Sequence, residues 1–200
     1  RAAQNLYEEG LITYMRTDSP TLSKQAVEAA RGQIESLYGE EYLSPTVRQF
    51  KSKSKGAQEA HEAIRPAGGQ FVHPKDISFS GKERALYELI WKRTLACQMA
   101  DAKKSSQVVK IKVGDLDFQA NGTKITFPGF LRVYVEGRDD PSAALDDKEV
   151  ILPHLETGNK LKVKEEGLRP TDHSTKPPAR FTEASLVNNL EKREIGRPSR

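Results

Sequence analysis

Residues 11–19 read Leu-Ile-Thr-Tyr-Met-Arg-Thr-Asp-Ser, a run that sets a tyrosine hydroxyl two residues from a guanidinium. Free tyrosine, whose pKa is about 10, is a weak nucleophile at neutral pH. It attacks a phosphate only where nearby cations stabilise the phenolate and the charge that builds on the phosphate. Because Arg16 supplies such a cation next to Tyr14, the run suits attack on a phosphate. The same spacing is also typical of a half-buried tyrosine at a strand end beside a solvated arginine.

Two further blocks of the sequence gather basic residues and proline. Residues 59–66 read Glu-Ala-His-Glu-Ala-Ile-Arg-Pro, and residues 176–199 open with Lys-Pro-Pro-Ala-Arg-Phe-Thr-Glu-Ala-Ser-Leu-Val and close with Gly-Arg-Pro-Ser. By itself His61, which stands next to Glu62 and four residues before Arg65, is equally typical of an ion-pair network on a helix surface. Spacing alone leaves both a structural and a catalytic interpretation of His61 open.

Taken together, the three blocks resemble the active-site segments of bacterial type IA DNA topoisomerases (topoisomerase I). Residues 11–19, preceded by Gln-Asn-Leu-Tyr-Glu at 4–8, are similar to the segment that carries the active-site tyrosine, and the other two blocks are similar to the second and third segments. The blocks follow one another in the family's order over nearly the whole chain. The resemblance implies an α+β fold, in which a helix-rich tyrosine-bearing domain is followed by an all-β arch or hinge domain.

In that family the tyrosine attacks one strand of negatively supercoiled DNA, forms a 5′-phosphotyrosine bond and releases a 3′-hydroxyl. A strand passes through the gap, and the hydroxyl then reverses the attack without ATP. The resemblance implies that Tyr14 is the nucleophile, that Arg16 neutralises the scissile phosphate and that His61 lines the same catalytic site. The residues that it implies for DNA binding are Arg16, Thr17, Asp18, His61, Arg65, Arg180, Ile195, Arg197 and Ser199, with Arg65 in a more structural role.

The resemblance also bears on metal binding. The family holds Mg²⁺ through an acidic cluster in an N-terminal Toprim domain, and nothing upstream of Arg1 is present. We therefore expect Mg²⁺ in the full-length enzyme, no metal site in this chain, and a chain that is catalytically incomplete by itself. Asp115 and Asp117 adjoin an expected turn and are not interpreted as metal ligands. Arg200 replaces the family's threonine, and the helical pattern opens without methionine, which together indicate an excised fragment.

Charge, hydropathy and cysteine content limit the classes of partner and the location that the chain can have. A pI near 9.1 and a net charge of +4 fit an anionic partner, and Arg48 is followed by a cluster of three lysines at 51–55. The mean hydropathy of −0.67 and the lack of a long apolar run argue against a membrane span. Cys97 is the single cysteine, which excludes an intrachain disulfide and suits a small core residue in a reducing cytosol. The resemblance goes further than composition and implies a cytoplasmic, nucleoid-associated monomer that binds single-stranded and negatively supercoiled DNA together with the remaining domains of the same polypeptide.

Helical periodicity dominates the first domain, expected over residues 1–100. A first helix ends at Gly10 and leads into a short strand at 11–13, and a second begins after Ser23 and ends at Gly39. A third helix begins with a capping box from Ser80 to Glu83. The expected buried faces are Val27, Ala30, Ile34, Leu37 and Tyr38 in the second helix, and Leu86, Leu89, Ile90, Leu95 and Ala96 in the third, with Trp91 at its flank.

Alternation of apolar and polar residues then indicates an all-β domain over residues 101–171. Strands are expected at 109–113, 116–120, 124–127, 130–135 and 160–164, with hairpin turns at Gly114-Asp115 and Asn121-Gly122 and a mobile loop at 138–148. The resemblance implies that residues 172–200 begin a DNA-groove domain. It opens with a linker, after which Thr182 caps a helix with Phe181 and Leu186 as a hydrophobic staple, and Gly196 ends that helix.

Two functions from other classes compete with the topoisomerase interpretation. The chain alone could act as a single-stranded DNA-binding gate module without turnover. A tyrosine recombinase or type IB nicking enzyme also uses tyrosine, but it becomes linked to a 3′ phosphate. Within the family, reverse gyrase and topoisomerase III are alternatives, although Met15 and the block at 176–187 favour bacterial topoisomerase I.

Overall fold

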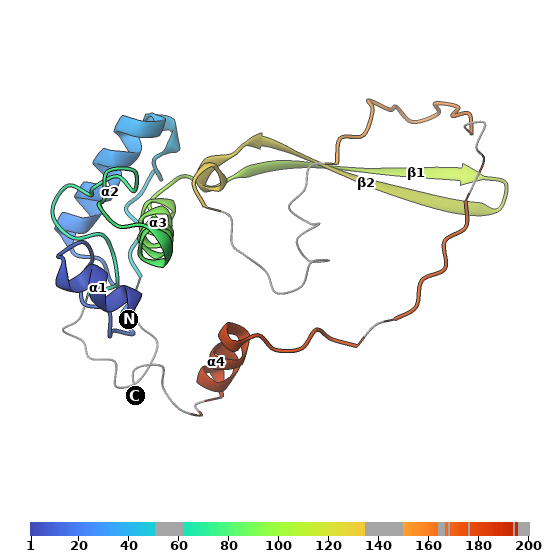
Figure 1. The fold of residues 1–200 in the computed structure, drawn as a ribbon. Helices are drawn as coiled ribbons and strands as arrows, with labels where there is room; N and C mark the ends of the chain where they lie inside the picture. The colour runs from blue at the N-terminus through green and yellow to red at the C-terminus, as the bar shows by residue number, and fades with distance from the viewer. Residues whose placement is uncertain are drawn as a thin grey trace. The chain divides into compact units, whose positions relative to one another are not determined.

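The computed structural model describes residues 1–50, 62–134, 150–163, 167, 169–175, 177–193 and 195. The chain divides into two compact units. The first comprises Arg1–Lys103, Phe127–Glu136 and Leu190–Arg200, and the second comprises Lys104–Thr126 and Gly137–Asn189. Figure 1 shows helices in the first and a long hairpin in the second. This mixture confirms the α+β class, and no helix in the described ranges is both long and apolar enough to cross a membrane.

Helix α1 (Ala2–Glu8) ends as the sequence predicts. Gly10 has a φ of +67°, a left-handed conformation that suits glycine at the position after a helix C-cap. The Gly10 amide donates to the Tyr7 carbonyl, and the Leu11 amide donates to the Leu6 carbonyl, each at 2.9 Å. These two bonds form a Schellman motif, which turns the chain directly into the Tyr14 segment.

Helix α2 (Lys24–Tyr38) begins at Ser23, whose hydroxyl accepts a hydrogen bond from the Ala26 amide at 3.2 Å, and ends at Gly39 with a φ of +101°. Both ends agree with the prediction. The buried face includes Ala30 and Ile34, but the expected Leu37 is 46% exposed. The short 3-10 helix η1 (Glu40–Tyr42) follows at once and buries Tyr42.

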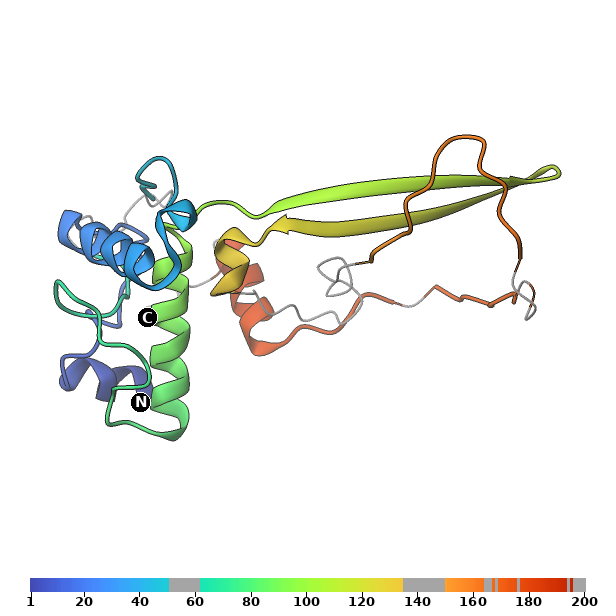
Figure 2. The same ribbon diagram turned by 90° about the horizontal axis from the view of Figure 1, so that it is seen from above.

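Helix α3 (Gly81–Ala96) packs against both α1 and α2, which lie alongside it in Figure 2. Because it is covered on more than one side, Trp91 is buried and not at a flank, whereas the expected core residue Leu89 is 50% exposed. The predicted capping box is also wrong. Ser80 makes no side-chain cap, and Glu83 instead accepts a hydrogen bond from the Asn5 side chain at 3.1 Å.

One hydrophobic core holds the helical unit together. Its buried members are Leu6, Ile12, Ala30, Ile34, Tyr42, Phe71, Ile77, Tyr87, Trp91, Leu95, Met99 and Val133. Cys97 is partly buried beside this core, and burial raises the pKa of its thiol. This environment agrees with the structural role expected for the cysteine.

The second unit is built on the antiparallel hairpin of β1 (Lys103–Val113) and β2 (Leu116–Phe127). The predicted turn at Gly114-Asp115 is confirmed, but the one at Asn121-Gly122 is wrong because β2 runs straight through it. A Cβ on Gly122 would lie 2.8 Å from the Leu152 side chain. Glycine therefore allows the segment around residue 152 to pack closely against β2, next to the bridge between Thr123 and Val150.

Two other strand predictions also fail. Within residues 130–135, the described part starts with the 3-10 helix η2 (Gly129–Arg132). A Cβ on Gly129, which has a φ of +48°, would lie within 2.6 Å of backbone atoms of Ala100 and Asp101, and this close packing favours a tight turn over a strand. Residues 160–163 are in no strand, while residue 164 and the expected loop at 138–148 lie outside the described residues.

Helix α4 (Glu183–Lys192) begins where the sequence predicts. The Thr182 hydroxyl accepts from the Ser185 amide at 3.2 Å, and the Ser185 hydroxyl accepts from the Thr182 amide at 2.9 Å. The helix buries none of its residues, and it ends at Lys192, ahead of Gly196, which lies outside the described residues. Phe181 and Leu186, the expected staple, are both exposed.

Candidate active site

The backbone before Tyr14 is fixed to the segment that follows His61. The Thr13 amide donates to the Arg65 carbonyl at 2.9 Å, and the Thr13 hydroxyl donates to the Ala63 carbonyl at 2.7 Å. The Arg65 amide donates back to the Thr13 hydroxyl at 2.9 Å. The strand expected at 11–13 is reduced to a single antiparallel bridge between Ile12 and Pro66. These bonds nevertheless hold two of the three sequence blocks together next to Tyr14.

Exposure alternates along the segment that carries Tyr14. Tyr14, Arg16 and Asp18 are exposed, whereas Thr13, Met15 and Thr17 are partly buried. Met15 packs against the core. The structure therefore presents the phenol and the guanidinium to solvent on either side of Met15, whose side chain packs against the core.

Tyr14 differs sharply from Tyr87, a tyrosine with a structural role. Tyr87 is 1% exposed, its hydroxyl donates to the Val72 carbonyl at 2.7 Å, and burial raises its pKa to about 12. The Tyr14 side chain is 39% exposed and its ring contacts Tyr7, with centroids 5.4 Å apart. Tyr14 is thus accessible to a large substrate, and Tyr87 is not.

Arg65 has a different environment from Arg16. Its side chain is 7% exposed and forms a bidentate pair with Glu62, Nε to Oε1 at 2.7 Å and an Nη to Oε2 at 3.0 Å. The other Nη donates to the carbonyls of Pro66 at 2.7 Å and Gly68 at 3.3 Å. Four of the five guanidinium N–H groups are therefore engaged within the protein, and we refer to this arrangement as the Arg65 clamp.

Glu62 completes the Arg65 clamp and also contacts the start of α2, because its Oε1 accepts from the Ser23 amide at 2.7 Å. Partial burial by itself raises the pKa of Glu62. Hydrogen bonds from Arg65 and Ser23 outweigh burial, so the pKa is lowered overall. The three-residue spacing of Glu62 and Arg65 is one at which ion pairs form locally, but the contact of Glu62 with Ser23, 39 residues away in the sequence, is visible only in three dimensions.

His61, the lysines of 51–55, Arg197 and Ser199 lie outside the described residues. Arg180 and Ile195 are described and exposed. Thr17 accepts a hydrogen bond from the Ser19 amide through its hydroxyl at 3.1 Å, which shapes the turn after Arg16.

A mainly apolar pocket of about 540 Å³ adjoins the Tyr14 segment. It lies between residues 17–22 and one face of α3. Its lining residues are Ala3, Thr17, Asp18, Ser19, Pro20, Leu22, Phe50, Ala63, Ile64, Leu86, Leu89, Ile90, Arg93, Thr94 and Cys97. The exposed Leu89 is one of these lining residues. The sequence predicts it in the core, but the structure places it at this pocket.

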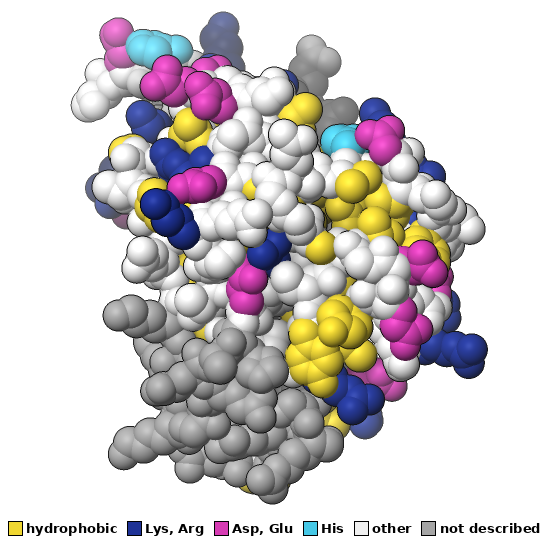
Figure 3. Space-filling model, turned by 90° about the vertical axis from the view of Figure 1, so that its left-hand side faces the viewer, with side chains coloured by type: hydrophobic (Ala, Val, Ile, Leu, Met, Phe, Trp, Pro, Cys, Tyr) yellow, Lys and Arg dark blue, Asp and Glu magenta, His cyan; other side chains and the backbone are white. Residues whose placement is uncertain are grey.

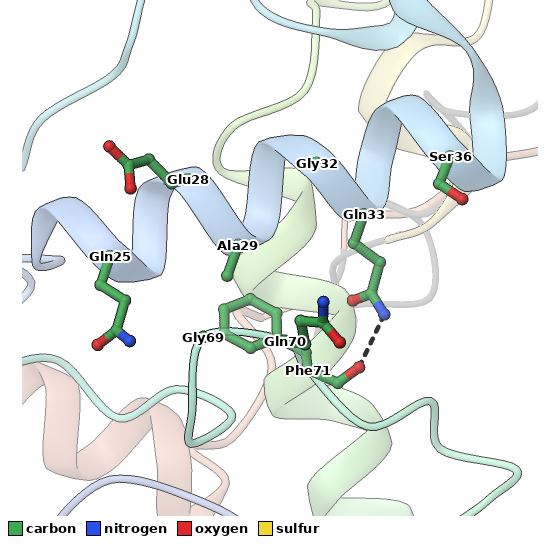
Figure 4. A pocket seen from close by; sticks show the side chains of 9 residues that line it. All are labelled: Gln25, Glu28, Ala29, Gly32, Gln33, Ser36, Gly69, Gln70 and Phe71. Carbon is green, nitrogen blue, oxygen red and sulfur yellow. Dashed lines mark hydrogen bonds between the residues drawn. The ribbon is translucent and has the colours of Figure 1, made fainter.

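A second pocket, of about 600 Å³, lies between α2 and residues 69–71 (Figure 4). Gln33 crosses it, donating to the Phe71 carbonyl at 2.8 Å and accepting from the Trp91 indole at 2.9 Å. Gln33 thereby ties three segments of the helical unit together. The lining contains neither an arginine nor a tyrosine, so it has no equivalent of the Tyr14 and Arg16 pair.

Charge on the face drawn in Figure 3 is mixed. Basic and acidic side chains alternate there, and hydrophobic side chains gather in patches between them. Exposed ion pairs such as Lys24 with Glu28 at 3.8 Å reflect the same mixture.

Within the described ranges, no three His, Cys, Asp or Glu side chains gather as they would to hold a metal ion. Asp115 in the hairpin turn and Asp117 in β2 are both exposed, and neither belongs to such a group.

Comparison with known proteins identifies the family. All 200 residues match the family model described as DNA topoisomerase. The chain is 58% identical over 199 residues to DNA topoisomerase 1 of Synechocystis sp., covering 100% of the chain and 22% of the relative. It is 55% identical over 204 residues to DNA topoisomerase 1 of Streptomyces coelicolor, covering 100% of the chain and 21% of the relative.

A solved structure agrees. Full-length topoisomerase I from Thermotoga maritima matches 99% of the chain, and 31% of its own chain, with a TM-score of 0.70 and 33% identity. The chain belongs to the bacterial type IA DNA topoisomerase family, which confirms the resemblance seen in its sequence. It spans about a fifth of the length of the curated relatives that it matches.

Proposed function

We propose that this chain is the part of a type IA topoisomerase that carries the nucleophile, Tyr14. The observation that carries the proposal is the exposure of Tyr14 and Arg16 on either side of the partly buried Met15, beside a backbone anchored at Thr13. A nucleophile that attacks DNA must be accessible, and the backbone that carries it must be fixed in position. Tyr14 meets both requirements.

The proposed reaction is a reversible transesterification. The Tyr14 oxygen loses its proton and attacks the phosphorus of one DNA strand, and the bond from phosphorus to the 3′ oxygen breaks. The tyrosine then holds the 5′ phosphate, and the strand keeps a free 3′-hydroxyl. Since one phosphate ester replaces another, the bond energy is conserved, and attack by the hydroxyl reseals the strand without ATP.

Arg16 would neutralise the charge that builds on the phosphate during attack, which is worth more in the transition state than in the bound state. Thr17 and Asp18 would complete the DNA-binding segment. We include His61 in the catalytic site, although it lies outside the described residues. For Arg65 we propose a structural role, since its guanidinium is occupied by Glu62 and by two backbone carbonyls.

The remaining parts of the proposal concern the whole polypeptide. Residues 1–100 would form the tyrosine domain, 101–171 the arch or hinge and 172–200 the start of the DNA-groove domain, where Arg180, Ile195, Arg197 and Ser199 contact DNA. The substrates would be single-stranded and negatively supercoiled DNA, handled by a monomer in the cytoplasmic nucleoid. When bound by other domains, Mg²⁺ would support the chemistry. The isolated chain would bind DNA without turnover.

A label-transfer assay with the full-length enzyme tests the proposal. A single-stranded oligonucleotide labelled at its 3′ end transfers its label to a protein that becomes linked to the 5′ phosphate, and one labelled at its 5′ end does not. We expect transfer from the 3′ label alone, and none from the Tyr14→Phe variant. The control is Tyr38→Phe, which removes a hydroxyl from α2. Transfer of the 5′ label would instead indicate the chemistry of type IB enzymes.

A further inference from the structure

The ring of Tyr14 makes an edge-to-face contact with a second exposed tyrosine. The Tyr7 and Tyr14 ring centroids lie 5.4 Å apart, and the ring planes meet at 71°. Tyr7 is 41% exposed and Tyr14 is 39% exposed. This distance and angle lie within the range at which aromatic rings attract each other.

Tyr7 is attached to a rigid part of the helical unit. The preceding residue, Leu6, is 0% exposed, and the Asn5 side chain donates to Glu83 of α3 at 3.1 Å. These two residues attach α1 to the core and to α3 directly before Tyr7. The Tyr7 carbonyl accepts from the Gly10 amide in the Schellman motif. The same motif directs the chain back, which brings Tyr14 to the side of α1 on which Tyr7 lies.

The backbone bonds at Thr13 fix where the Tyr14 side chain begins, but they do not fix its two side-chain torsions. In-line attack on a phosphate requires the phenolic oxygen to be aimed within a narrow range, and loss of that alignment slows the reaction. A ring that contacts the nucleophile's ring narrows its rotamers before DNA binds. The contact therefore adds a constraint on the Tyr14 ring to the backbone bonds at Thr13.

We propose that Tyr7 is a positioning residue for Tyr14: its ring restricts the Tyr14 ring and so raises the rate of attack on the phosphate. The inference rests on the proposed function, in which Tyr14 is the nucleophile. Tyr7 acts through its ring and not through its hydroxyl. Converted into a rate ratio, the energy of such a ring pair limits the loss of rate on removing the contact to about two- to twelvefold.

The test uses three variants of the full-length enzyme. Tyr7→Leu removes the ring but keeps an apolar side chain, Tyr7→Phe keeps the ring, and Leu37→Ala is a control at an exposed site on α2. For each we would measure the single-turnover rate of covalent adduct formation at saturating oligonucleotide, the Kd of the oligonucleotide, and the thermal unfolding midpoint. Because Tyr7 is exposed, we expect all three to fold.

The expected result is a rate about two- to twelvefold lower for Tyr7→Leu, with Kd within about twofold of the wild type, and a normal rate for Tyr7→Phe. An unchanged rate for Tyr7→Leu would overturn the proposal. So would a weaker Kd at a normal rate, which would make Tyr7 a stacking platform for a DNA base. If Tyr7→Phe were as slow as Tyr7→Leu, the hydroxyl would be the active group. A parallel Tyr14→Phe sample separates these outcomes from failure of the proposed function, which an adduct on that variant would reveal.

Discussion

Replacing Arg65 with methionine tests whether the Arg65 clamp supports the site or contacts DNA. The change removes four hydrogen bonds and leaves the Glu62 carboxylate and the carbonyls of Pro66 and Gly68 without these donors. Breaking a fully buried ion pair costs about 3–5 kcal/mol. The Glu62 side chain is 26% exposed and regains some hydration, so we expect the free energy of unfolding to fall by about 2–4 kcal/mol.

Trp91 provides the assay. It is the single tryptophan, and it is buried in the core of the helical unit, so its fluorescence reports unfolding of that unit in urea. Arg65→Lys should recover little of the loss, because an ammonium group cannot form the bidentate pair. Lys24→Met removes an exposed ion pair and should change stability by less than about 0.5 kcal/mol. An unfolding free energy unchanged in Arg65→Met, combined with weaker oligonucleotide binding, would refute the structural role and make Arg65 a phosphate contact.

Three further predictions follow from single contacts. The pKa of Glu62 is lower in the folded state than its unfolded value of 4.5, so the ionised carboxylate stabilises the fold above pH 4.5. This stabilisation is lost as the pH falls through the folded pKa. On acid titration, the free energy of unfolding should therefore fall less in Glu62→Gln than in the wild type. Gly129→Ala would place a methyl group within 2.6 Å of backbone atoms and should lower the free energy of unfolding in urea by at least about 2 kcal/mol. Gly10 has open space around it, so Gly10→Ala should lower that free energy by about 1–2 kcal/mol through its backbone angle alone. Equal losses in the two variants would contradict the role of close packing at Gly129. Burial raises the pKa of the Cys97 thiol, so iodoacetamide at pH 8 should modify it at least about tenfold more slowly in the folded protein than in urea, and equal rates would show that the thiol is accessible.

Local signals in the sequence predict helix ends well and tertiary contacts poorly. Gly10, Ser23 and Thr182 act through bonds to residues within a few positions, so the pattern contains all that is needed to place them. The capping box at Ser80 fails because Glu83 binds a residue from α1 instead. The turn at Asn121-Gly122 fails because that glycine accommodates a segment from far along the chain.

The candidate site divides in the same way. Tyr14 and Arg16 stand out in the sequence, since their chemistry depends on two residue types at short spacing. Glu62 and Arg65 are spaced for a local ion pair, but the burial of that pair, the bond from Ser23 to Glu62 and the ring contact of Tyr7 depend on the tertiary fold. The functional roles of all the site residues, Tyr14 and Arg16 included, stay predictions, and His61, Arg197 and Ser199 lie outside the described part of the chain.

The most direct test of the central claim is to identify the residue that becomes linked to DNA. The full-length enzyme would be trapped on a cleaved oligonucleotide, digested with nuclease and trypsin, and examined by mass spectrometry. Our account predicts that the peptide containing residues 11–16 carries a nucleotide joined through its 5′ phosphate to Tyr14. A nucleotide on any other residue, or one joined to Tyr14 through a 3′ phosphate, would contradict the account.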